Sequence, residues 1–163
     1  MIVYHGATEI IKKPDIEHSK KYLDFGRGFY VTTFEEQAQK WAVRNSMRQE
    51  QTAIVNAYEM LEARGDFRVL SFEKENEKWL DFVCACRRGE PLNEGYDIII
   101  ENVADDDVFK TVDMYFRGLW DKKRALQELR YYKLNNQICI VTQQALDRLI
   151  GFKEAYEVIG YGR

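Results

Sequence analysis

The stretch of sequence that decides the fold is Leu23-Asp24-Phe25-Gly26-Arg27-Gly28-Phe29-Tyr30-Val31-Thr32-Thr33. Its two glycines, one residue apart, predict a sharp turn, because glycine adopts backbone conformations that other residues avoid. The aromatic and β-branched residues that follow predict a strand over 29–32. Thr33 is a candidate N-cap with Glu36 three residues later, so we expect a helix over 34–49. The apolar face of that helix is expected to hold Phe34, Ala38, Trp41, Ala42 and Met47.

Outward from this stretch, strand and helix patterns follow one another in mixed order. Strands are predicted over 2–4, 52–58, 67–72, 96–100, 137–141 and 155–159. Helices are predicted over 76–88, 105–118, 121–132 and 143–150. Asp105-Asp106-Asp107 is typical of a helix start, where carboxylates meet the positive end of the dipole. About seven strands and several helices predict a single α+β domain over residues 1–163, with a split or two-sheet arrangement.

The composition is typical of a globular protein, with 45% apolar and 31% charged residues among 163. The net charge of −3 disfavours generic binding to nucleic acid. No apolar run approaches the roughly eighteen residues of a membrane span, and Met1–Gly6 lacks the features of a signal peptide. A cytoplasmic protein without membrane contact is therefore expected. The cysteines, Cys84, Cys86 and Cys139, are expected to be small core residues, and because no spacing suits zinc, no metal is expected.

Three motifs in a fixed order carry the functional signal. A strand ends in Tyr4-His5-Gly6, the glycine turn leads into Phe29-Tyr30-Val31-Thr32, and a C-terminal strand begins at Asn136-Gln137. This set resembles the ADP-ribosyltransferase superfamily, and within it the diphtheria-toxin-like branch, which includes the poly(ADP-ribose) polymerases and carries a His-Tyr-Glu signature. The sequence is most similar to a bacterial family of such domains without an assigned function. The phrases that carry this narrower similarity are Val3-Tyr4-His5-Gly6, residues 23–30, Val103-Ala104-Asp105-Asp106 and Asn136-Gln137.

The resemblance implies a split β-sheet core with flanking helices, NAD⁺ as the substrate, and a catalytic set of His5, Tyr30 and Gln137. In the resembled families the histidine binds ribose hydroxyls, a role that falls to His5. Gly6 would offer backbone groups to the nicotinamide carboxamide, and Tyr30 would stack on the nicotinamide ring. Trp41 matches the second aromatic ring around the nicotinamide, although its helical spacing fits core packing equally well. Each aromatic face would contribute about 0.5–2 kcal/mol to holding the cationic ring.

Two positions depart from the pattern of the family. Ala38 stands where polymerase-type members have a serine, and Gln137 stands where the catalytic glutamate is usual. A unit charge 4 Å away is worth roughly 4 kcal/mol at an effective dielectric of about 20, so the loss of this carboxylate would slow the reaction strongly. Glu101, Asp105 and Asp106 are candidates to supply the negative charge that is missing at position 137. Glu9, Asp24 and Arg27 are candidates to border the cofactor, and the sequence alone does not show where they lie.

Two functions therefore stay open. The first is a mono-ADP-ribosyltransferase or NAD⁺ glycohydrolase that releases nicotinamide, a toxin or defence component with a protein or nucleic-acid acceptor and an antitoxin or regulatory partner. The alternative is a catalytically inactive module that binds NAD⁺ or ADP-ribose, which the glutamine at 137 favours. An RNA-repair transferase that moves a 2′-phosphate onto NAD⁺ is disfavoured by the acidic isoelectric point of about 5.5.

Overall fold

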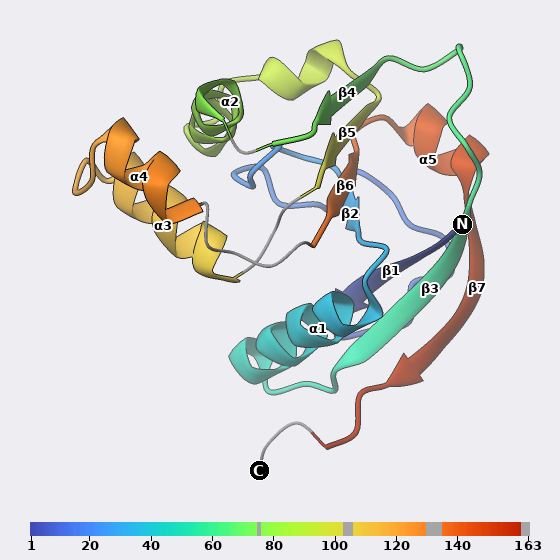
Figure 1. The fold of residues 1–163 in the computed structure, drawn as a ribbon. Coiled ribbons are helices and arrows are strands. Elements are labelled where there is room, and N and C mark those ends of the chain that lie inside the picture. Colours follow the sequence, from blue (N-terminus) through green and yellow to red (C-terminus); the bar gives the residue numbers. More distant parts are fainter. Residues whose placement is uncertain (75, 103–105, 130–134, 161–163) are drawn as a thin grey trace.

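The computed structural model describes residues 1–74, 76–102, 106–129 and 135–160. Within these residues the chain forms two β-sheets, five α-helices and one short 3₁₀ helix (Leu92–Gly95) (Figure 1). The first sheet is antiparallel and has the order β1 (Ile2–Ala7), β3 (Ile54–Met60), β7 (Ile150–Glu157). The expectation of an α+β chain with two sheets is confirmed.

The second sheet has four strands in the order β2 (Phe29–Val31), β6 (Gln137–Ile140), β5 (Ile98–Glu101), β4 (Val69–Phe72). The pairs β2–β6 and β6–β5 are antiparallel, whereas β5–β4 is parallel. A parallel pair needs a crossover, and α2 (Glu77–Arg87) lies between β4 and β5 in the chain. Strands distant in the sequence therefore lie side by side in this sheet.

Alternation along the strands divides the core into layers. Ile98 and Ile140 face the first sheet, where they join an apolar cluster with Val3 and Tyr58. Their neighbours along the strands point to the opposite face of the second sheet, as the pleat requires. There Ile99 and Cys139 pack in a cluster with Trp79, Leu80 and Val83 of α2.

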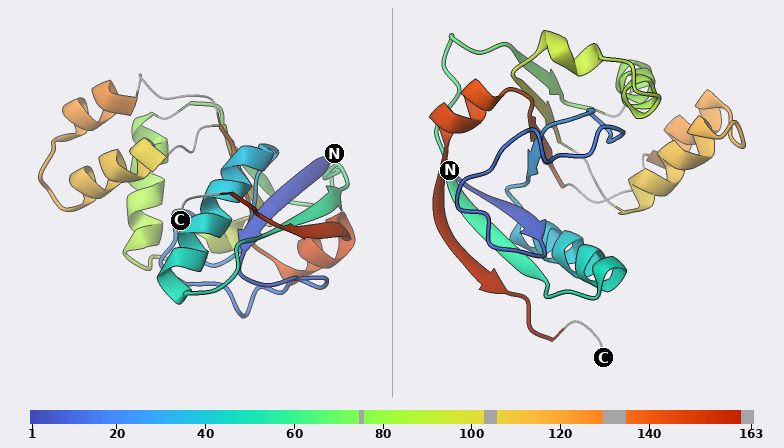
Figure 2. Two further views of the ribbon diagram at one scale, coloured as in Figure 1. Left: turned by 90° about the horizontal axis from the view of Figure 1, so that it is seen from below. Right: turned by 180° about the vertical axis from the view of Figure 1, so that it is seen from behind.

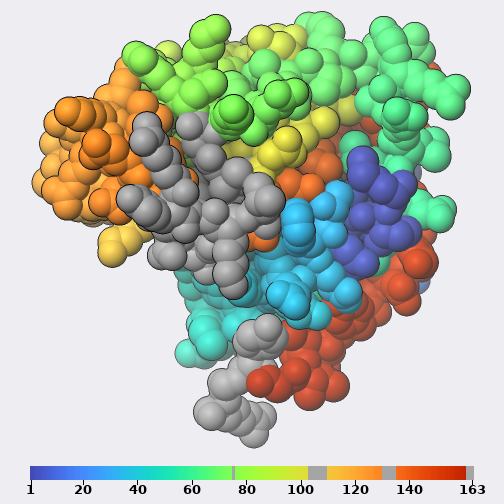
Figure 3. Space-filling model, viewed as in Figure 1, coloured from blue at the N-terminus to red at the C-terminus, as the bar shows by residue number. Residues whose placement is uncertain are grey.

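The helices cover the outer faces of the two sheets. The first helix, α1 (Glu35–Gln49), packs on β1 and β3 through a small cluster of Ala38, Ala42 and Val55. On the other side of the molecule lie α2, α3 (Asp106–Phe116) and α4 (Lys122–Glu128) (Figure 2). In the space-filling view α4 forms one edge of the molecule (Figure 3). The last helix, α5 (Gln143–Leu149), contributes Ala145, Leu146 and Leu149 to the core between the sheets.

Several boundaries differ from the sequence-based predictions. The N-cap of α1 is Phe34, not Thr33, because the Thr33 hydroxyl accepts a hydrogen bond from Asn136 instead of capping the helix. Phe34 and Met47 are 41% and 65% exposed, so they do not belong to the buried face of α1. The last strand begins at Ile150, immediately after α5, and not at residue 155. All three cysteines are buried and free, as expected.

Within the described ranges, no helix combines the length and the apolar character that a membrane crossing needs. The same residues contain no group of three or more His, Cys, Asp or Glu side chains arranged to hold a metal ion.

Candidate functional site

The two sheets meet at a single isolated bridge between Tyr4 and Thr32. The Tyr4 amide donates to the Thr32 carbonyl at 2.8 Å, and the Thr32 amide donates to the Tyr4 carbonyl at 3.0 Å. Extending this antiparallel register would set Gly6 opposite Tyr30, but the bridge is isolated, so β1 and β2 diverge there. The result is a fork between the strands that carry the first two sequence motifs.

His5 closes the near end of this fork. Its Nδ1 atom lies 2.6 Å from the backbone carbonyl oxygen of Tyr30. Because a carbonyl only accepts hydrogen bonds, Nδ1 carries the proton and Nε2 is left as an acceptor. Burial lowers the pKa of His5 below its ordinary value of 6.5, although the bond to Tyr30 opposes this. The imidazole also stacks on Phe29, with ring centroids 4.5 Å apart. His5 is thus held as a neutral ring with a defined tautomer.

Gly6 is required by the close approach of α1. A Cβ atom at this position would lie 2.2 Å from the Ala38 carbonyl oxygen and 2.6 Å from the Ala42 nitrogen. The backbone N–H and C=O groups of Tyr4 both bond to Thr32, so they point away from β3. Residues two apart in a strand point their backbone groups to the same side, so the N–H and C=O of Gly6 also point away from β3, toward the fork. The Gly6 carbonyl accepts a hydrogen bond from the Asn45 side chain at 3.4 Å. Ala38, whose carbonyl oxygen makes this close approach, is fully buried.

A cavity of about 990 Å³ opens at the fork, which is large enough for a dinucleotide-sized ligand. All five site residues predicted from the sequence line it: His5, Gly6, Tyr30, Trp41 and Gln137. The structure therefore brings together residues from β1, β2, α1 and β6 that span most of the chain.

One face of α1 forms a wall of this cavity. Trp41, Arg44, Asn45 and Arg48 all line it, and their spacing of i, i+3, i+4 and i+7 places them on one side of a helix. Trp41 is only partly buried, so it belongs to the cavity wall and not to the closed core. The spacing of the two arginines around Trp41 is a signal that the sequence analysis missed.

Part of the long connection between β1 and β2, residues 8–28, also lines the cavity. Figure 2 shows it running from the first sheet across to the second. The buried side chain of Asn56 anchors it by accepting from the Ile11 amide at 2.8 Å and donating to the Glu9 carbonyl at 3.0 Å. The Tyr58 hydroxyl donates to the Ile11 carbonyl at 2.7 Å.

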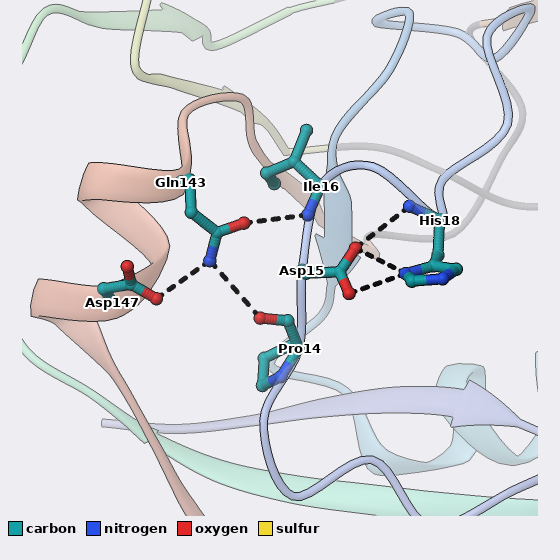
Figure 4. A network of polar contacts seen from close by, with 6 residues as sticks. All are labelled: Pro14, Asp15, Ile16, His18, Gln143 and Asp147. Carbon is teal, nitrogen blue, oxygen red and sulfur yellow. Dashed lines mark hydrogen bonds and ion pairs between the residues drawn. The ribbon is translucent and has the colours of Figure 1, made fainter.

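A second anchor of this connection comes from α5 (Figure 4). The Gln143 side chain accepts from the Ile16 amide at 3.0 Å and donates to the Pro14 carbonyl at 3.4 Å. The side-chain NH₂ group of Gln143 also donates to the carboxylate of Asp147, one turn further along α5, at 2.8 Å. Two core elements thus shape a segment that has no regular structure of its own.

The turn at residues 24–28 is fastened to Tyr30. The Tyr30 hydroxyl donates to the Gly26 carbonyl at 2.6 Å and accepts from the Phe25 amide at 3.0 Å. Gly26 has a φ of 70°, a left-handed conformation that favours glycine. Burial raises the pKa of Tyr30 well above its ordinary value, and the nearby Cys139 and Asp24 add to this shift. The phenol is therefore a neutral structural group at the base of the cavity.

A buried polar network continues from this turn to Gln137. Asp24 is 7% exposed and lines the cavity, and its carboxylate pairs with Arg87 Nε at 2.7 Å. Burial raises the pKa of Asp24, whereas the Arg87 guanidinium and a hydrogen bond from the Gln137 side chain stabilise its ionised form. The Gln137 amide also donates to Glu101 at 3.3 Å, across the register of β5 and β6. Glu101 is 2% exposed.

The lining of the cavity is richer in cationic than in anionic side chains, although the chain as a whole is acidic. The carboxylates are Glu9, Asp15, Asp24 and Asp113. The cationic residues are Lys12, Lys13, Lys20, Arg44, Arg48 and Arg87. A ligand that carries phosphate groups would therefore meet a favourable potential in this cavity.

The remaining candidates divide between the cavity and the rest of the molecule. Glu9 and Asp24 line the cavity, whereas Arg27 is not among its lining residues. Residues 103–105, with most of the Val103-Ala104-Asp105-Asp106 motif, lie outside the described part of the chain. The backbone of Asp106 and Asp107 forms the start of α3, so the predicted helix start is confirmed for these two residues.

Comparison with known proteins gives a family but no function. No curated protein matches the chain. The model of a family described as a protein of unknown function (DUF3990) matches residues 1–150. Because that match covers most of the 163 residues, the protein belongs to the DUF3990 family.

Proposed function

We propose that this protein is an NAD⁺-dependent mono-ADP-ribosyltransferase with an ADP-ribosyltransferase-like split β-sheet core. The convergence of His5, Gly6, Tyr30, Trp41 and Gln137 on one cavity carries the proposal. Three separate sequence motifs and one position on α1 supplied these residues, and a chance likeness would not gather them around a single cavity.

In this proposal each residue has a role toward NAD⁺ that its geometry supports. His5, neutral and with Nε2 as an acceptor, suits a hydrogen bond from a ribose hydroxyl. The backbone of Gly6 faces the fork, where it can bind the nicotinamide carboxamide. Tyr30 and Trp41 both line the cavity, and aromatic rings hold a flat cationic ring by stacking and cation–π attraction.

The cationic lining suits the diphosphate of NAD⁺. Arg44 and Arg48 on α1 line the cavity, and so do Lys12, Lys13 and Lys20 of the connection over residues 8–28. Phosphate groups beside these side chains would be bound through charge-assisted hydrogen bonds. A cavity with this polarity fits a dinucleotide better than an uncharged metabolite.

The proposed reaction breaks the bond between ribose C1′ and the nicotinamide nitrogen. The electron pair of that bond leaves with nicotinamide, which becomes neutral, and the sugar passes through an oxocarbenium-like state. An acceptor nucleophile or a water molecule then bonds to C1′ and loses a proton to solvent. The protein contributes by holding the ribose and the ring in a fixed orientation and by favouring positive charge on the sugar.

A binding module without catalysis is the second candidate, and the position of Gln137 favours it. The amide of Gln137 lines the cavity where the resembled families place a carboxylate. Roles as a toxin or defence component with a regulatory partner remain predictions from the resemblance.

The test is incubation of the folded protein with NAD⁺ labelled separately in the adenine and the nicotinamide, with and without a bacterial lysate. Transfer of the adenine label to macromolecules together with free nicotinamide supports the transferase, and nicotinamide release alone supports a glycohydrolase. Calorimetric binding of NAD⁺ without either product supports the module. Absence of binding and of both products would overturn the proposal. The His5→Asn variant is the control for activity from contaminants, because it should lose most of any product formed.

A further inference from the structure

We propose that Asn45 of α1 is a specificity-determining residue of this cavity, and that its side chain selects a dinucleotide with a carboxamide on the pyridine ring over one with a carboxylate there. This inference rests on the proposed function, since it concerns the same cavity and the same ligand. It adds a side chain to a contact that the proposed function gives to the backbone of Gly6 alone.

The packing of α1 against β1 places Asn45 beside Gly6. The helix and the strand come so close that a Cβ atom on Gly6 would lie 2.9 Å from the Cβ atom of Trp41. One turn further along α1, the Asn45 side chain donates a hydrogen bond to the Gly6 carbonyl at 3.4 Å. After another turn, the Gln49 side chain accepts a hydrogen bond from the Thr8 hydroxyl at 3.3 Å. The helix therefore runs alongside the end of β1 and holds Asn45 level with Gly6.

The cavity face of α1 also places Asn45 next to the proposed ring-binding residue. Asn45 follows Trp41 by four residues, and side chains with this spacing are neighbours on a helix surface. Both side chains are half-buried, and both line the cavity together with Gly6. A nicotinamide ring stacked on Trp41 would therefore carry its carboxamide within reach of the Gly6 backbone and of the Asn45 side chain.

The hydrogen bond to Gly6 decides which atom of the Asn45 amide is left for a ligand. A carbonyl oxygen only accepts hydrogen bonds, so the NH₂ group of Asn45 faces Gly6. The Oδ1 atom of Asn45 has no hydrogen-bond partner among the residues that the structure describes. Turning the amide over would set two oxygen atoms against each other, so the Gly6 carbonyl holds Oδ1 in place as an acceptor.

A carboxamide matches these groups, whereas a carboxylate does not. The NH₂ group of the ligand has two hydrogens, which the Gly6 carbonyl and Asn45 Oδ1 can accept, and the ligand oxygen can accept from the Gly6 N–H. The Gly6 carbonyl has two lone pairs, so it can bond to the ligand and to Asn45 together. A carboxylate in the same place would set an oxygen against both acceptors and leave them unpaired. A site built in this way rejects the analogue that lacks the donor.

The test measures the dissociation constants of NAD⁺, nicotinic acid adenine dinucleotide and ADP-ribose by calorimetry at neutral pH, where the acid analogue carries a carboxylate. ADP-ribose lacks the pyridine ring, so it reports on the rest of the cavity. Asn45→Ala should weaken NAD⁺ binding by about tenfold and leave the affinity for ADP-ribose unchanged. The preference for NAD⁺ over the acid analogue should fall by about the same factor or more, because an acceptor that opposes the carboxylate is removed.

Two further variants separate the acceptor atom from the shape of the side chain. Asn45→Asp keeps the size and the acceptor oxygens, and its charge repels a carboxylate, so it should keep or increase the preference for NAD⁺ over the acid analogue. Gln39→Ala is the matched control on the same helix. It removes an amide that donates to the Tyr156 hydroxyl at 3.1 Å and does not line the cavity, so all three affinities should match the wild type. Thermal unfolding checks that each variant is folded.

Each result decides the inference. If Asn45→Ala weakens NAD⁺ and ADP-ribose by the same factor, or weakens neither, Asn45 does not bind the carboxamide, and the inference is overturned while the proposed function stands. An equal loss of preference in Asn45→Asp and Asn45→Ala would show that Oδ1 is not the atom that faces the ligand, which also overturns it. A wild-type chain that does not bind NAD⁺ would instead overturn the proposed function, and this inference with it.

Discussion

The Nδ1 atom of His5 lies 2.6 Å from the backbone carbonyl oxygen of Tyr30, and this bond takes the place of the strand pairing that stops at Tyr4 and Thr32. The two sheets can therefore separate without leaving the Tyr30 carbonyl unbonded. The same bond sets the tautomer of His5 and turns its other nitrogen into an acceptor. The hydrogen bond that lets the two strands diverge therefore also leaves His5 Nε2 as an acceptor for a ligand.

The pH dependence of stability is the first prediction. Because burial lowers the pKa of His5 in the folded chain below the ordinary value of 6.5, the unfolded chain binds the proton more readily. This contribution to the free energy of unfolding is present above about pH 6.5 and is lost as the pH falls toward the pKa of the folded state, with a slope of up to about 1.4 kcal/mol per pH unit. Urea unfolding at intervals between pH 5 and 8 measures it.

The matched variants for this prediction are His5→Asn and His18→Asn. The first should flatten the slope below pH 6.5, and the second should keep it, because His18 is on the surface and its imidazole pairs with Asp15 outside the core. An identical slope in the wild type and His5→Asn would contradict the role given to burial.

Close packing at Gly6 gives the second prediction. Gly6→Ala would drive a methyl group to within 2.2 Å of the Ala38 carbonyl oxygen, so α1 must shift away from β1. We expect a loss of about 3 kcal/mol in the free energy of unfolding, measured by chemical denaturation. Gly65→Ala is the control, because an added Cβ there meets no atom within 4 Å, and it should be neutral or slightly stabilising. Equal effects of the two changes would show that α1 does not pack as described.

The Tyr30 hydroxyl is the subject of the third prediction. Tyr30→Phe removes both of its hydrogen bonds to the glycine turn, at 2.6 Å and 3.0 Å, and leaves a partly buried amide and carbonyl without that partner. The cost should be about 1–3 kcal/mol in the free energy of unfolding. Tyr22→Phe, at a side chain that is 64% exposed, should change it by less than about 0.5 kcal/mol. The hydroxyl would have no anchoring role if the two phenylalanine variants unfolded alike.

The cationic face of α1 leads to the fourth prediction. Arg48→Gln should weaken the binding of NAD⁺ and of ADP-ribose by a similar factor, about 5- to 20-fold, because both ligands carry the diphosphate. The loss should shrink at high salt, since ions screen the charges. Calorimetry at two salt concentrations measures both effects. Arg148→Gln removes an exposed arginine of α5 that is not part of the cavity lining and should leave the affinities unchanged. A loss for NAD⁺ alone would contradict contact with the diphosphate.

Much of the fold follows from local signals, and the network around Gln137 does not. The β-branched run at 98–100 and the aromatic run at 29–31 predict their strands. They can do so because the residue pattern of a strand involves only residues that are close together in the sequence. The sequence places the N-cap of α1 at Thr33, one residue too early, because the Thr33 hydroxyl instead bonds to Asn136, 103 residues away. The pairs Asp24–Arg87 and Glu101–Gln137 join residues 63 and 36 positions apart. Such pairs depend on sheet order and register, which no local pattern contains.

A crystal structure of the wild-type protein with NAD⁺ tests the central claim most directly. Our account predicts electron density for the nicotinamide between Tyr30 and Trp41, a ribose hydroxyl within hydrogen-bond distance of His5 Nε2, and the diphosphate beside Arg48. Density for NAD⁺ elsewhere on the protein, or an unaltered cavity at an NAD⁺ concentration of several millimolar, would contradict it.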